Sequence, residues 1–154
     1  MAIFIVGTDG SDLAIRAGIA GLSLMKPADK VLVVSVADVV DPSLADDATG
    51  HASSTMTHED VEANHREVRG EARAAVEATA EELRKLESSH DRLELRVIDG
   101  DPGRALCQLA AEVDASALIV GTRGRGGLRR AFLGSVSDYI VRNAPCSVVV
   151  SRDA

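Results

Sequence analysis

The chain contains few aromatic residues, few cysteines and no long apolar run, and each shortage excludes a class of protein. Aromatic residues make up 2% of the 154 residues whereas 45% are hydrophobic, so aliphatic side chains must build the core. The two cysteines, Cys107 and Cys146, lie in apolar sequence and do not cluster as metal ligands do, so we expect buried, reduced thiols. No run approaches the roughly 18 apolar residues of a membrane-spanning helix.

Positive charge is also scarce. The net charge of −7 argues against general binding to nucleic acid or to an anionic membrane. Four of the 17 basic residues nevertheless fall between Arg123 and Arg130, which favours a small anionic ligand over a long polyanion. The first apolar run, Ile3–Val6, is too short for a secretory signal and no basic segment precedes it, so we expect a cytoplasmic protein.

Short apolar runs alternate with amphipathic segments along the whole chain. Five runs fit buried parallel strands, at residues 3–8, 31–36, 93–98, 117–120 and 147–150. The third run alternates between apolar and charged residues, which predicts a strand at the edge of the sheet. Regular alternation of strands and helices predicts an α/β fold, an open five-stranded parallel sheet with helices on both faces, in one domain spanning residues 1–154.

Helix-like spacing occupies the segments between these strands. The first helix has a cap at Ser11 or Asp12, ends by Pro27 and buries one face, made of Ile15, Ile19, Leu22 and Met25. A long helix over 58–87 buries a stripe of Val61, His65, Val68, Ala72, Val76, Thr79, Leu83 and Leu86. Asp101-Pro102 is a typical start for the third. Residues 38–57 are small, polar and without periodicity, which predicts a mobile loop.

The last third of the chain places a strand, a loop rich in glycine and arginine, and a helix start at Gly134–Ser135 in close succession. Glycines let backbone N–H groups approach a ligand, and the first turn of a helix has unpaired N–H donors and partial positive charge. One interpretation is a polyphosphate site. The other is a solvated basic loop before an ordinary helix, whose start is explained by a capping box of Ser135 and Asp138.

The spacing Gly121-x2-Gly124-x9-Gly134-Ser135 resembles the signature of nucleotide-binding universal stress proteins, in which the same pattern wraps ATP. The turn Thr8-Asp9-Gly10-Ser11 is also typical of that family, so the resemblance covers the whole chain. It implies a Rossmann-like sheet of strand order 3-2-1-4-5, and ATP as the bound adenine nucleotide, with Mg or Mn. It also implies a homodimer formed by antiparallel pairing of the last strand, Ser147–Ser151.

The resemblance further implies roles for individual residues. Asp9 matches an acidic residue near the adenosine and its metal, Val36 a residue beside the adenine, and residues 134–137 the helix start that receives the terminal phosphates. The complete set is Thr8, Asp9, Val36, Gly121, Arg123, Gly124, Arg125, Gly134, Ser135, Val136 and Ser137. The alternatives are a simple turn aspartate at Asp9, a core residue at Val36 and solvated arginines. Ser35 departs from the family, which often has histidine there.

These features predict a nucleotide-dependent sensor or regulator of the stress response rather than an enzyme. Fast phosphoryl transfer needs a fixed cation on the phosphates, yet no lysine follows Lys85 and the arginines lie in a glycine-rich loop. A capping Asp138 would not serve as the base. Motifs of P-loop NTPases and of α/β-hydrolases are absent from the sequence. The alternatives are a nucleotide-free dimeric interaction module and a slow ATPase.

Overall fold

The computed structural model describes residues 1–39, 57–86, 92–123 and 133–152. Within them, five strands alternate with four helices, as the apolar runs predict. In chain order the elements are β1 (Ile3–Gly7), α1 (Asp12–Ser23), β2 (Lys30–Ala37), α2 (His58–Leu83), β3 (Leu93–Asp99), α3 (Pro102–Glu112), β4 (Ala117–Gly121), α4 (Ser135–Asn143) and β5 (Ser147–Ser151).

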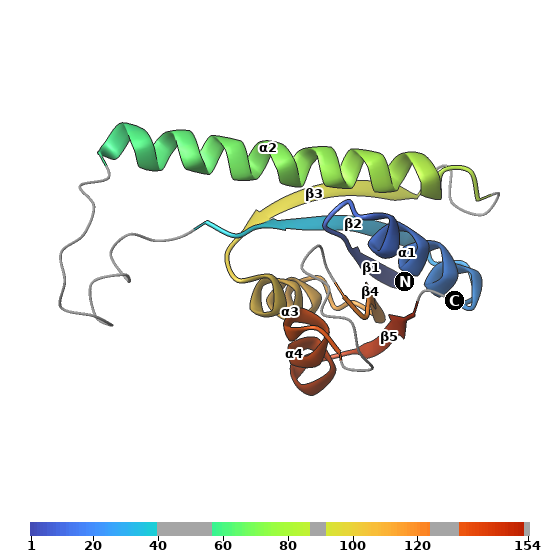
Figure 1. The fold of residues 1–154 in the computed structure, drawn as a ribbon. Coiled ribbons are helices and arrows are strands. Elements are labelled where there is room, and N and C mark those ends of the chain that lie inside the picture. Colours follow the sequence, from blue (N-terminus) through green and yellow to red (C-terminus); the bar gives the residue numbers. More distant parts are fainter. Residues whose placement is uncertain (40–56, 87–91, 124–132, 153–154) are drawn as a thin grey trace.

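The strands form one parallel sheet in the order β3-β2-β1-β4-β5, which confirms the expected order and the edge position of β3. Helices α1 and α2 cover one face of the sheet, and α3 and α4 cover the other (Figure 1). Because side chains alternate along a strand, Phe4 and Val6 of β1 pack in the core on the α1–α2 face. Ile3 and Ile5 pack in the core on the α3–α4 face.

Helix α1 lies unusually close to the sheet. The residues it buries fully are small, namely Ala14, Ala17, Gly18 and Gly21, whereas the predicted face of Ile15, Ile19, Leu22 and Met25 is only half-buried. A Cβ atom at Gly18 would lie 2.9 Å from Cγ1 of Val6, and one at Gly21 would overlap the Ile119 side chain. The predicted face was therefore incomplete: Ile19, Leu22 and Met25 pack against the core, but the fully buried residues of α1 are the small ones.

Helix α2 begins at His58 as predicted but ends at Leu83, not at residue 87. Its cap is Thr57, which exchanges hydrogen bonds with Asp60. The predicted stripe is fully buried only from Ala72 to Leu83, and its residues before and after that segment are half-buried at most. The first half of α2 extends beyond the sheet (Figure 1). Helical periodicity predicts which residues share a face, but not where the sheet beneath them ends. Residues 40–56 of the predicted loop lie outside the described residues.

The remaining expectations concern α3 and the cysteines. Asp101 caps α3 by accepting a hydrogen bond of 3.0 Å from the Arg104 N–H, with Pro102 in the first turn, as predicted. Cys107 is buried and Cys146 half-buried, and both are free thiols. Burial raises the pKa of each thiol, which keeps it protonated. No helix in the described part of the chain is long and apolar enough to cross a bilayer.

Two glycine-to-alanine substitutions in helices are expected to act in opposite directions. Gly21→Ala places a methyl group against Ile119, and we expect it to lower the free energy of unfolding by about 1–3 kcal/mol. Gly70→Ala on α2 meets no atom within 4 Å, so the gain in helix propensity should raise it by about 0.5–1 kcal/mol. Urea unfolding midpoints measure both. Equal effects of the two substitutions would contradict the close approach of α1.

Candidate functional site

The predicted site residues lie where three neighbouring strands of the sheet end, at their carboxyl-terminal ends. We call this end of the sheet the carboxyl edge. Because β2, β1 and β4 are adjacent and parallel, Val36, Thr8, Asp9 and Gly121 lie at the same edge. The Thr8 N–H continues the ladder by donating to the Val34 carbonyl at 2.9 Å. This edge is where open α/β sheets bind ligands, since the chain leaves β1 and β4 towards opposite sides of it.

The turn after β1 is ordered by its own side chains. The N–H and the hydroxyl of Ser11 both donate to Oδ1 of Asp9, at 2.9 and 2.5 Å. Ser11 Oγ also accepts from the Ala14 N–H at 3.2 Å, so Ser11 is the predicted cap of α1. Asp9 is thus the turn aspartate of the alternative interpretation, and the same hydrogen bonds fix the direction of its carboxylate at the rim.

The start of α4 is fastened directly to the end of β4. The Gly134 N–H donates to the Thr122 carbonyl at 2.7 Å, and the Ser137 hydroxyl lies 3.0 Å from the same carbonyl and 3.1 Å from the Gly134 carbonyl. The Thr122 N–H in turn donates to the Ser151 carbonyl of β5 at 3.1 Å. The Ser137 side chain is 2% exposed, so its hydroxyl is used inside the protein to hold the helix start in place.

The predicted capping box of Ser135 and Asp138 is wrong. The cap residue is Gly134, in an extended conformation, and it makes no side-chain hydrogen bond to the helix. Ser135 is the first helical residue and its side chain is exposed. Asp138 instead pairs with Arg142 one turn later, with 3.0 Å between Oδ2 and Nε. Because the helix starts one residue earlier than the box requires, its first-turn amides have no side-chain cap among the described residues.

The other predicted residues fall into four groups. Val36 and Val136 are half-buried and pack against the core on the α3–α4 face, which fits the core alternative for Val36. Gly121 is half-buried, and a Cβ atom there would lie 3.5 Å from the Ala17 Cβ. Arg123 is exposed at the end of the described loop segment. The two remaining members of the set, Gly124 and Arg125, lie outside the described residues.

Two residues that support this edge were not assigned to it from the sequence. Thr122 accepts the hydrogen bonds from α4, and Thr79 of α2 bonds to the Thr8 hydroxyl at 2.8 Å. Thr79 was predicted to be buried, and it is 0% exposed. Its hydroxyl was a signal, because a buried hydroxyl needs a partner, but the sequence does not say where that partner lies.

Comparison with known proteins identifies the family. A family model described as the universal stress protein family matches residues 1–152. The chain belongs to the universal stress protein family. Over 149 residues, this universal stress protein is 29% identical to Universal stress protein MJ0531 of Methanocaldococcus jannaschii, an alignment that covers 96% of this chain and 80% of that protein.

Two solved structures resemble this universal stress protein over nearly its full length. Universal stress protein UspA from Lactobacillus plantarum superposes with a TM-score of 0.75 at 21% identity, covering 98% of this chain and 97% of that one. A universal stress protein crystallised in complex with cAMP has a TM-score of 0.54 at 25% identity, covering 97% and 94%. The first comparison confirms the fold, and the second shows a similar protein that carries an adenine nucleotide.

Proposed function

We propose that this universal stress protein binds ATP at the edge formed by the ends of β1, β2 and β4 and the start of α4. The observation that carries the proposal is the first turn of α4, which is fastened to β4 and has no side-chain cap among the described residues. Amides at such a position bind anions, because their N–H groups lack helical partners and the helix dipole adds positive charge. The similar protein that binds cAMP supports an adenine nucleotide as the ligand.

The residues at this edge suit the parts of a nucleotide. The half-buried Val36 would supply an apolar surface for the adenine. Gly121 would contact the ribose and phosphates, together with Gly124, which lies outside the described residues. Arg123 and Arg125 add positive charge. The start of α4 receives the terminal phosphates through the amides of residues 134–137 and the exposed hydroxyl of Ser135. We assign Ser137 to holding the helix start rather than to direct contact, because its hydroxyl is already used by Thr122 and Gly134.

A divalent cation would be held by Asp9 together with the phosphates. The described residues contain no group of three or more histidine, cysteine, aspartate or glutamate side chains that would bind a metal without the nucleotide. Mg²⁺ is commonly bound by one or two carboxylates plus substrate phosphates, and the fixed direction of the Asp9 carboxylate fits that arrangement. When bound, Mg or Mn would neutralise phosphate charge.

Binding rather than turnover is the activity that we propose, so the protein acts as a nucleotide-dependent sensor or regulator. Hydrolysis needs a group that orients the attacking water. Asp138 does not have the capping role that the sequence predicted, and its carboxylate pairs with Arg142 on the surface of α4. A rate of phosphate release near one per second from purified protein with Mg-ATP would support an enzyme instead.

A homodimer through β5 is the second part of the proposal. β5 lies at one edge of the sheet, next to β4, and its residues from Val148 to Ser151 are half-buried. The Ser151 carbonyl accepts from the N–H of Thr122, the residue that follows β4, so the backbone of Ser151 and of alternate residues before it, including Val149, faces β4. The N–H groups of Val148 and Val150 therefore face away from β4, on the side where no further strand lies among the described residues, and we propose that a second chain pairs there.

ATP binding is tested by one change of charge at the start of α4. We expect Ser135→Asp to weaken ATP binding at least tenfold by repelling the phosphates, while the dipole keeps the helix as stable as before. Ser116 is exposed and lies just before β4, at the opposite, amino-terminal ends of the strands. Ser116→Asp therefore adds the same charge far from the site and should leave the affinity for ATP unchanged. Isothermal titration calorimetry with Mg-ATP measures both.

The wild type supplies the reference for this comparison. At ATP concentrations ~100-fold above the dissociation constant, binding should stabilise the fold by about 2.7 kcal/mol. That gain corresponds to a rise in melting temperature of roughly 5–10 °C for a chain of this length. If millimolar ATP leaves the melting temperature of the wild type unchanged, the proposal is contradicted and the nucleotide-free interaction module is favoured.

The dimer is tested by two proline substitutions at neighbouring positions. Val148→Pro removes an N–H at the open edge, so we expect the mass measured by sedimentation to fall from dimer to monomer with the fold preserved. Val149→Pro removes an N–H that faces β4 and should instead lower the melting temperature. A wild type that sediments as a monomer at micromolar concentration, or an unchanged dimer in Val148→Pro, would contradict the proposed interface.

A further inference from the structure

We infer that Thr79 of α2 is a positioning residue for the nucleotide site: it holds the turn after β1 through a directional chain of hydroxyl hydrogen bonds. The inference rests on the proposed function, because it concerns the affinity of the same site. Thr79 lies 71 residues away from Thr8 in the sequence, on the helix that covers the α1–α2 face of the sheet.

The direction of these hydrogen bonds follows from the single proton that each hydroxyl can donate. The Thr79 hydroxyl donates its single proton to the Ala75 carbonyl at 2.8 Å. Thr79 Oγ1 and Thr8 Oγ1 are 2.8 Å apart, and either atom is placed to donate. Since the Thr79 proton is already used, Thr8 must be the donor and Thr79 the acceptor. Thr8 Oγ1 in turn accepts from the Gly10 N–H at 3.0 Å.

The Thr8 hydroxyl is therefore occupied on both sides. Its proton goes to Thr79 and one of its lone pairs receives the Gly10 N–H. Thr8 is also buried, with 8% of its surface exposed. Its hydroxyl therefore holds the turn in place and does not donate to a phosphate. What Thr8 contributes to binding is the position of the residues that follow it, above all Asp9.

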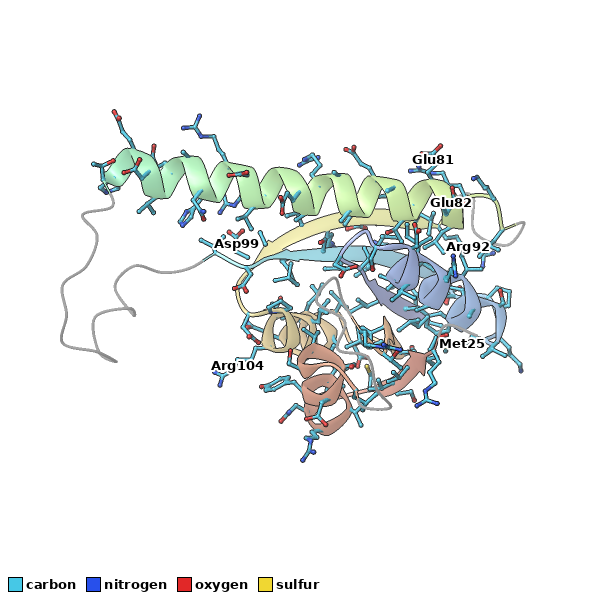
Figure 2. The ribbon with its side chains drawn as sticks, in the orientation of Figure 1. Met25, Glu81, Glu82, Arg92, Asp99 and Arg104 are labelled. Atoms are coloured by element: carbon cyan, nitrogen blue, oxygen red, sulfur yellow. The ribbon has the colours of Figure 1, made fainter. Side chains whose placement is uncertain are left out.

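The turn after β1 packs directly against α2. Gly10 has a φ of +78°, and a Cβ atom there would lie 2.9 Å from both Cα and Cβ of Ala75. The backbone of the turn thus rests directly on the helix, one turn before Thr79. In its less buried half, α2 is also bonded to the sheet, because Arg69 Nε donates to Oδ1 of Asp99 at 2.9 Å. Asp99 lies at the end of β3, next to α2 (Figure 2).

Substitutions at position 79 can change the hydroxyl and the side-chain volume separately. Valine at position 79 keeps the shape but removes the acceptor for Thr8, which leaves a buried hydroxyl proton without its partner. Serine keeps the hydroxyl but leaves a small cavity at a fully buried position. Both substitutions lower stability, but only valine breaks the chain that holds the turn.

The test compares ATP affinity and stability in the full-length protein. We expect Thr79→Val to raise the dissociation constant of Mg-ATP by about five- to tenfold, the value of one lost hydrogen bond. Thr79→Ser should restore affinity to within about twofold of the wild type while the urea midpoint stays lowered. Val76→Ala, in the core one turn earlier, is the control for general destabilisation and should leave affinity unchanged.

Two further measurements decide between outcomes. Thr8→Val combined with Thr79→Val should bind no more weakly than Thr8→Val alone, because Thr8→Val already removes the hydrogen bond to Thr79. Equal affinity of Thr79→Val and wild type, or a loss of affinity in Thr79→Ser or Val76→Ala as large as the loss in Thr79→Val, would overturn the inference. Amide exchange of Gly10 without ATP tests the turn alone: faster exchange in Thr79→Val supports the chain even if the wild type fails to bind ATP, and unchanged exchange contradicts it.

Discussion

The pairing of β1 with β2 on one side and β4 on the other is the constraint on which the site depends. Because all three strands are parallel, their carboxyl ends meet at one edge, and the chain leaves β1 towards α1 while it leaves β4 towards α4. Segments separated by more than 100 residues are thereby placed at neighbouring strand ends. The sheet is buried on both faces, so this placement follows from the core and needs no ligand to form.

Backbone and hydroxyl hydrogen bonds turn that placement into a defined surface. On the β4 side, Gly134 and Ser137 converge on the Thr122 carbonyl and bring the start of α4 against the strand. On the β1 side, the Thr8–Thr79 bond and the packing of Gly10 on Ala75 fix the turn. These groups are used within the protein, and they leave the first-turn amides of α4 as the group suited to an anion. The residues that hold this surface in place thus differ from those that we propose bind the nucleotide.

The fold was largely predictable from the sequence, because apolar runs and helical periodicity record burial directly. The strand order came from the family resemblance. Three features were not predictable. The buried face of α1 depends on Gly18 and Gly21, whose small size signals close packing only once the strands beneath are known. The start of α4 lies one residue earlier than the capping box requires, so Ser135 is the first helical residue and not the cap. Thr79 reached the site through contacts distant in sequence, which periodicity does not contain.

The most direct test of the account is a titration of the isotopically labelled protein with Mg-ATP, followed by amide nuclear magnetic resonance. The account predicts that the largest shifts occur at two separated segments, residues 8–11 after β1 and residues 134–137 at the start of α4. Amide resonances at the amino-terminal ends of the strands, such as that of Ser116, should not shift. Shifts confined to one of the two segments, or no shifts at millimolar ATP, would contradict a nucleotide site that bridges β1 and α4.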